Sequence, residues 1–160
     1  MTVHLPAPKE VRDLLADLLG RDVVISPTAP LAPSAESPAT FAVYVDDSFQ
    51  VAAVIVLDVA LSAYAGAAIG LVPPTVAKNS IRWNVLTPLL EENLREVLNV
   101  TVNLFHSGDS DHLRLHVVHP AGGPVPQDVL ARSLTLGRRT DVSVQVAGYG
   151  TGVLSVVLAP

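Results

Sequence analysis

The amino-acid sequence predicts an α+β fold, in which an antiparallel or mixed sheet built from hairpins carries helices packed on one side. Three observations predict this fold. Alternating apolar residues with turn residues between them mark two hairpins, at residues 40–57 and 141–159. Apolar residues at helical spacing mark residues 9–19 and a longer region over residues 76–106. The resulting order is helix, hairpin, helix, long helix, strand and hairpin, which favours a sheet assembled from neighbouring strands.

The composition is that of one globular domain spanning residues 1–160. Hydrophobic residues make up 49% of the chain and charged residues only 16%, which argues against disorder and indicates a buried face between subunits or against a partner. The net charge is −5 and no basic patch lies beyond Arg138 and Arg139, so nucleic acid is not an expected partner. The absence of cysteine excludes disulfides, thiolate catalysis and Cys-ligated zinc, and it fits a cytoplasmic protein.

No membrane insertion is expected from the apolar stretches. The N-terminal residues lack a long apolar run after a basic start, so they do not resemble a signal peptide. The longest apolar stretch, residues 59–72, is too short to span a membrane and is rich in small residues. It is therefore interpreted as a buried helix.

The first elements are a helix, a short strand and a loop. The helix at residues 9–19 is followed by Gly20, a natural stop. The sequence DVVIS, residues 22–26, predicts a short strand. Residues 27–39 hold four prolines without periodicity and predict a loop, either inside the domain or as a mobile excursion from it.

The first hairpin leads directly into the buried helix. Asp46, Asp47 and Ser48 supply turn residues between its two arms. The second arm, residues 51–56, is apolar on both faces, as expected of a central strand. Asp58 then stands where it can cap the helix that follows, which ends near Pro73 and Pro74.

The second half begins with the long helical region, in which Thr87 and Pro88 resemble an N-cap and a first helical position. The region is thus either two helices or one kinked helix. Residues 112–118 then predict a strand and residues 126–134 a short helix. In the last hairpin, alternating valines and a glycine-rich turn predict two paired strands.

Polar side chains gather on one face of the helix over residues 88–105. The apolar residues of this stretch share one face by their spacing, and the polar residues fall on the opposite side. Glu96 and Asn99 are three residues apart, so their side chains are neighbours that point away from the core. One interpretation is an ordinary solvated helix face. The other is that Glu96 and Asn99 act together as a chemical site. The polar residues of this face are Glu92, Arg95, Glu96, Asn99 and Asn103.

The segment from Glu92 to Asn99 has an acidic residue, three residues, a glutamate, two residues and an asparagine. This pattern resembles the signature of the CheC/CheX family of chemotaxis phosphatases. The order of elements also resembles that family, with an N-terminal helix, a hairpin feeding a first helix, the motif on a later helix and a closing hairpin. Because the first buried helix has no Glu–Asn pair, the chain resembles single-site CheX more closely than two-site CheC.

The resemblance implies a CheX-like domain that removes the phosphoryl group from a phosphorylated, CheY-like receiver domain in chemotaxis or two-component signalling. In such a phosphatase, Asn99 positions the attacking water and Glu96 binds a lysine of the receiver. Glu92, Arg95 and Asn103 would contact the partner around them. The Mg²⁺ ion belongs to the receiver, so no cofactor or metal site of its own is expected, and CheX-like proteins are homodimers. The competing expectation is a non-catalytic binding or scaffolding domain with the same fold.

Three other groups of residues resemble known kinds of site. His112, His116 and His119 are close in sequence, but on a strand the first two stand about 13 Å apart, too far for one metal ion. Residues 148–152, GYGTG, lie between alternating strands and predict a hairpin turn, not a nucleotide loop. Ser110, His112 and Asp109 lack the strained turn of a serine nucleophile. The single tryptophan, Trp83, is expected in the core or in a dimer contact.

Overall fold

A computed structural model describes residues 3–160 and contains one sheet of six strands in the order β1-β5-β6-β3-β2-β4. Every neighbouring pair is antiparallel, so the predicted α+β class is confirmed. The strands are β1 (Val23–Pro27), β2 (Ala39–Val45), β3 (Val51–Asp58), β4 (Arg114–His119), β5 (Arg139–Val146) and β6 (Gly150–Leu158). The helices are α1 (Pro8–Leu19), α2 (Val59–Ile69), α3 (Pro74–Trp83), α4 (Pro88–Thr101), the 3-10 turn η1 (Val102–Phe105) and α5 (Gln127–Ser133).

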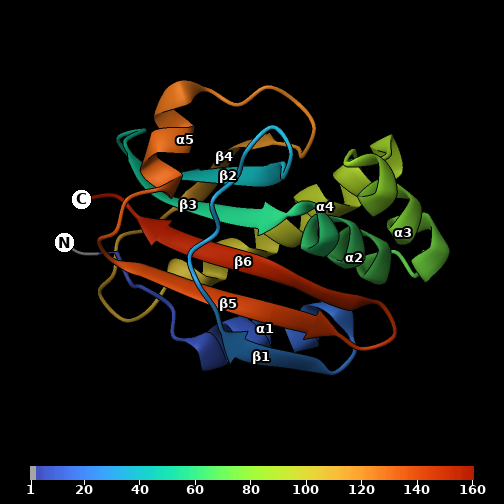
Figure 1. The fold of residues 1–160 in the computed structure, drawn as a ribbon. Coiled ribbons are helices and arrows are strands. Elements are labelled where there is room, and N and C mark those ends of the chain that lie inside the picture. The colour runs from blue at the N-terminus through green and yellow to red at the C-terminus, as the bar shows by residue number, and fades with distance from the viewer. Residues whose placement is uncertain (1–2) are drawn as a thin grey trace.

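Helices lie on both faces of the sheet, which corrects the prediction that they pack on one side (Figure 1). The larger core cluster joins one sheet face to α1, α2, α4 and η1. A smaller cluster on the other face contains Phe41, Val43 and Val56, and Val129 of α5 covers it. Because both faces of β2 are covered, all its residues are buried. The prediction failed for α5 because a seven-residue helix gives too short a pattern to assign a face.

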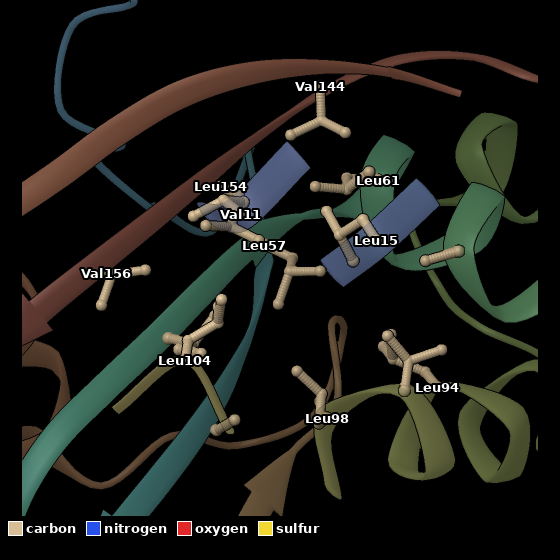
Figure 2. Packing of buried hydrophobic residues seen from close by; sticks show 14 of the residues in the cluster. Val11, Leu15, Leu57, Leu61, Leu94, Leu98, Leu104, Val144, Leu154 and Val156 are labelled. Atoms are coloured by element: carbon tan, nitrogen blue, oxygen red, sulfur yellow. The ribbon is translucent and has the colours of Figure 1, made fainter. Parts of the chain in front are cut away.

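The larger core lies between the sheet and the helices. Figure 2 shows Leu15 of α1, Leu61 of α2 and Leu94 and Leu98 of α4 pointing toward Leu57 of β3. All of these side chains are at most 3% exposed. Burying each one contributes roughly 1.5–3 kcal/mol, so this cluster is the main stabilising force that fixes α4 on the sheet.

Most of the residues that the sequence marks as helix boundaries act as such, but α2 ends at Ile69, before Pro73, and Pro74 instead begins α3. Gly20 adopts the left-handed conformation after α1 with φ of 65°, and the Asp58 carboxylate accepts from the Leu61 backbone N–H at 2.8 Å. The Thr87 hydroxyl accepts from the Leu90 N–H at 3.2 Å, with Pro88 in the first turn. The region 76–106 is therefore two helices and not one kinked helix. Among residues 3–160, no helix is long and apolar enough to cross a membrane.

The proline-rich segment is a loop inside the domain, running over residues 28–38 between β1 and β2. Figure 1 shows it crossing the sheet on the same face as α5. Leu31 packs against the smaller core cluster, and its N–H donates to the Ser155 hydroxyl at 3.3 Å. The alternative of a mobile excursion away from the domain does not apply to this packed segment.

Burial of the Asp58 carboxyl leads to a prediction about pH. Burial raises the pKa of Asp58, while the backbone N–H groups of Leu61 and Val153 partly oppose this shift. A carboxyl whose pKa is raised on folding contributes stability below its ordinary pKa of 3.8, and this contribution is lost as the pH rises through the folded pKa. We expect Asp58→Asn, which keeps a capping side chain, to remove that component.

Urea unfolding followed by far-ultraviolet circular dichroism at several pH values checks this expectation. The unfolding free energy of the wild type, minus that of Asp58→Asn, should fall between pH values below 3.8 and neutral pH. A difference that stays constant over this range would show that Asp58 titrates alike in the folded and unfolded chain.

Candidate functional site

The candidate site is the outer face of α4. Leu94, Val97 and Leu98 are each 1% exposed and hold the inner face of the helix against the core. Glu96 and Asn99 lie on the outer face and are both exposed. They occupy one turn of an uninterrupted helix, so their side chains are neighbours and can reach into another protein together. Sequence periodicity predicted this exposure.

The three residues predicted to contact a partner are also exposed, but they do not all lie on one regular helix. Glu92 and Arg95 are on α4, whereas Asn103 lies in the 3-10 turn η1. The sequence predicted one helix through residue 105, and the structure ends it at Thr101. β-Branched Thr101 and Val102 are poor helix formers, and the Thr101 hydroxyl donates to the Leu98 carbonyl at 2.8 Å. Asn103 is thus displaced from the stripe of Glu92, Glu96 and Asn99.

A buried tyrosine holds the end of α4 beside Asn99. The hydroxyl of Tyr44, on β2, donates to the Leu98 carbonyl at 2.7 Å and lies 2.9 Å from the Thr101 hydroxyl. Burial raises the pKa of the Tyr44 phenol, so it stays protonated and able to donate. The carbonyl that accepts this bond belongs to the residue just before Asn99, so the contact fixes the backbone that carries the candidate side chain.

We expect Tyr44→Phe to lower the free energy of unfolding by about 1–2 kcal/mol, because the hydrogen bonds of a fully buried hydroxyl are lost. Tyr64→Phe is the matched control, since no hydrogen bond joins the Tyr64 hydroxyl to any group within residues 3–160. The control should change the unfolding free energy by less than about 0.5 kcal/mol. Urea unfolding measures both, and equal losses would mean that the hydrogen bonds of the Tyr44 hydroxyl contribute no net stability.

Helix α2 packs closely against α4 where Gly66 meets Leu90. A Cβ atom at Gly66 of α2 would lie 2.7 Å from the Leu90 carbonyl oxygen, so only glycine fits at this crossing. Asn93 of α4 donates from its side-chain Nδ2 to the Gly66 carbonyl at 2.9 Å. Asn93 is one turn before Glu96, so this contact positions the part of α4 where the exposed polar pair begins.

Glu96 and Asn99 are free to interact with another molecule. Within residues 3–160, the side chains of α4 and its cap that form hydrogen bonds are those of Thr87, Asn93 and Thr101. An exposed carboxylate can accept hydrogen bonds or pair with a cation, and an exposed amide can both donate and accept. The pair can therefore bind a cationic group and orient a water molecule side by side.

A groove of about 260 Å³ extends from this face toward the sheet edge. Glu91, Glu92 and Arg95 of α4 line one side of it, and Val118 and Pro120 line the other. The sequence predicts Glu92 and Arg95 as contact residues but gives no sign of the groove. No local pattern could reveal it, because α4 and β4 are brought together only by the folded sheet.

Solved structures of other proteins share this fold. No protein-family model and no curated protein matches the sequence. The FliM middle domain of Vibrio alginolyticus has a TM-score of 0.59 to this chain at 11% identity, covering 96% of this chain and 88% of that one. FliM in the FliM–SpeE complex of H. pylori has a TM-score of 0.60 at 8% identity, covering 94% and 80%. The chain has the fold of the FliM middle domain. FliM in the FliG–FliM complex of H. pylori also matches, with a TM-score of 0.50 at 10% identity over 94% and 85%.

The FliM fold places the chain among known architectures. FliM middle domains belong to the CheC/FliM-like chemotaxis fold family. The resemblance to that family is therefore supported at the level of the fold alone. The narrower resemblance to CheX rests on the residues from Glu92 to Asn99.

The other sequence candidates do not form sites on this FliM fold. His116 lies on β4 as predicted, and His119 ends the same strand, one residue beyond the predicted range. His112 lies before β4 and not on it, and its ring stacks on that of His106 with centroids 4.8 Å apart. No group of three or more possible metal ligands is brought together within residues 3–160. The Ser110 hydroxyl donates to the Phe105 carbonyl at 2.9 Å and so is committed to the loop. The predicted hairpin is present, with its turn at residues 147–149. The last three residues of the GYGTG segment, 150–152, already belong to β6 and pair with β5.

Trp83 is not in the core, so the expectation of a core position is wrong. Its side chain lies at the end of α3 and is 73% exposed. The prediction failed because α3 buries only a narrow stripe, formed by Ala77 and Ser80. The nearby Val85 and Leu89 are about half exposed as well, so an apolar surface remains at this end of the FliM fold.

Proposed function

We propose that this protein is a phosphatase that hydrolyses the aspartyl phosphate of a response-regulator receiver domain. The observation that carries the proposal is the joint exposure of Glu96 and Asn99 on one turn of a rigidly packed helix. Neither side chain forms a hydrogen bond with another group of residues 3–160, so both are available to a partner. The chemotaxis fold family of the structural neighbours supports the same function.

The chemistry needs only positioning from this chain. A water oxygen attacks phosphorus, the bond from phosphorus to the aspartyl oxygen breaks, and the products are inorganic phosphate and the free carboxylate of the receiver. The Asn99 amide can hold this water in line with the breaking bond by hydrogen bonding and adds no negative charge beside the phosphoryl group. The receiver supplies the Mg²⁺ ion in this proposal.

Docking is assigned to the charged residues around Asn99. Glu96 would pair with a lysine of the receiver and thereby set the position of Asn99. Glu92 and Arg95, which line the groove beside β4, and Asn103 of η1 would contact the surrounding receiver surface. We also propose a cytoplasmic homodimer, for which exposed Trp83, Val85 and Leu89 offer an apolar surface.

A second function is favoured by the partners of the structural neighbours. FliM has been crystallised in complexes with FliG and with SpeE, so this fold can act as a binding domain. On this alternative, the chain binds a signalling partner without chemistry, and the exposed face of α4 is a contact surface only.

The test is the decay of a phosphorylated receiver in the presence of Mg²⁺, with and without this protein, followed as release of inorganic phosphate. The phosphatase proposal requires catalytic release that scales with the amount of this protein. Binding to the receiver without faster release would support the scaffolding alternative instead. If neither release nor binding occurs with any of a panel of receivers, the phosphatase proposal is wrong.

A further inference from the structure

A cavity of about 500 Å³ lies on the sheet face opposite to α4. Ala39 and Phe41 of β2 line it from the sheet. Phe41 belongs to the smaller core cluster, whereas α4 packs on the larger one, so the sheet separates the cavity from the Glu96–Asn99 face. The cavity therefore takes no part in the proposed phosphatase site.

Three segments that are distant in sequence form the walls. The proline-rich loop contributes Pro33, Ala35 and Pro38. Val125 and Leu130, which precede and lie on α5, form the opposite wall. These side chains are apolar, so together with the sheet they make a hydrophobic hollow between the loop and α5.

The loop wall is fixed to the sheet by specific hydrogen bonds. The Leu31 N–H donates to the Ser155 hydroxyl of β6 at 3.3 Å, and that hydroxyl donates to an Asp141 carboxylate oxygen at 2.6 Å. The Thr28 N–H donates to the Asp141 carbonyl at 3.3 Å. The loop is thus held at its start by β5 and β6 and at its end by β2.

The α5 wall is held by the same buried network. Arg139 pairs with Asp141 at 2.9 Å, and the two side chains are 7% and 10% exposed. The Arg139 Nη1 also donates to the carbonyls of Ser133 and Thr135, at 3.1 and 2.7 Å, at the end of α5. One ion pair is therefore connected both to the start of the loop and to the end of α5, and so holds the two walls to the same strands of the sheet.

The cavity edge offers hydrogen bonds but no charge. Gly122 and Gly123 bring backbone to the edge, and Gly122 has a φ of 93° that a side chain would strain. Asn84 and Ser34 are the lining residues with polar side chains, and none of the lining residues within 3–160 is ionisable. A charged ligand would lose hydration there without gaining a partner.

We propose that this cavity binds a small, uncharged and largely apolar molecule. Its volume falls within the range of ligand pockets, roughly 300–1,000 Å³, and its apolar lining with a few polar groups at the edge is typical of them. The apolar body of the ligand lies against Phe41 and Leu130, and a hydroxyl or carbonyl group meets Asn84. This binding is separate from the phosphatase proposal and stands whether or not the protein hydrolyses phosphate.

The test uses the neutral dye Nile red, whose fluorescence rises on entering an apolar site, titrated with the full chain. Ala35→Phe places a ring in the cavity from an exposed loop position, so it blocks the site without disturbing the core. The matched control is Ala32→Phe, an exposed position of the same loop that does not line the cavity. We expect the dye to bind at least about tenfold more weakly to Ala35→Phe and unchanged to Ala32→Phe.

A second variant tests whether dye binding weakens when the cavity is altered without adding an aromatic residue. Leu130→Asp adds a charge to the opposite wall and should weaken dye binding by a similar factor, with circular dichroism confirming that α5 and the sheet remain folded. Equal dye affinity in the wild type and both cavity variants would overturn the proposal. So would loss of dye binding on Trp83→Ser alone, which would place the dye on the exposed apolar surface at the end of α3.

Discussion

We expect Asn99→Ala to slow hydrolysis of the receiver phosphate by on the order of 100-fold or more, because the attacking water loses the group that holds it in line. Binding of the receiver should change little, since Asn99 acts on the water and Glu96 acts on the partner. The expected effect is therefore a lower kcat with a similar KM. Single-turnover release of phosphate measures the chemical step directly.

Matched variants make this result specific. Asn79→Ala removes an exposed asparagine from α3 and should keep the full rate. Asn99→Asp keeps the shape of the side chain but places a negative charge beside the phosphoryl group, so it should be about as slow as Asn99→Ala. Wild-type rates in both Asn99 variants would remove the catalytic assignment and leave a binding domain.

Glu96→Ala separates docking from chemistry. Loss of the carboxylate should raise KM for the phosphorylated receiver, and the effect should shrink at high salt because the lost interaction is an exposed ion pair. Glu36→Ala, an exposed glutamate on the loop across the sheet, is the control. A fall in kcat alone on Glu96→Ala would contradict the docking role.

We expect Gly66→Val to have the largest effect on stability, lowering the free energy of unfolding by about 2–3 kcal/mol. The added Cβ would meet the Leu90 carbonyl oxygen at 2.7 Å, so the backbones of α2 and α4 must separate. This separation also breaks the hydrogen bond from Asn93 to the Gly66 carbonyl. Gly66→Ala should cost less, since the better helix propensity of alanine offsets about 1 kcal/mol.

Gly137→Val is the control for this change. A Cβ at Gly137 meets nothing within 4 Å, so the unfolding free energy should change by less than about 0.5 kcal/mol. Thermal unfolding followed by circular dichroism compares the three variants. A loss no larger at Gly66 than at Gly137 would mean that the two helices can separate freely, and that the crossing does not position α4.

Local sequence patterns predicted most elements because those elements depend on local spacing and capping. The stripe of buried leucines in α4 predicted that Glu96 and Asn99 are exposed, and Thr87 predicted where the helix begins. Its end was less predictable, since a 3-10 turn at Val102 continues the same apolar spacing. Whether the exposed pair acts on a receiver is a matter of partner chemistry, which no spacing within one chain contains.

Features formed between distant segments could not be predicted. The face covered by α5 depends on one buried valine, Val129, within a helix of seven residues. The cavity joins Phe41, Asn84 and Leu130, which only the folded chain brings together. The groove beside Arg95 depends likewise on the placement of β4 at the sheet edge.

The position of the one tryptophan decides how this protein can be studied in solution. The Trp83 indole is already surrounded by water in the native state, since 73% of it is exposed. Its emission spectrum should therefore barely change when the chain unfolds, and denaturation curves recorded by indole emission will be nearly flat. The same property makes it a clean reporter of association, because a blue shift on mixing with another protein would locate the contact at the end of α3.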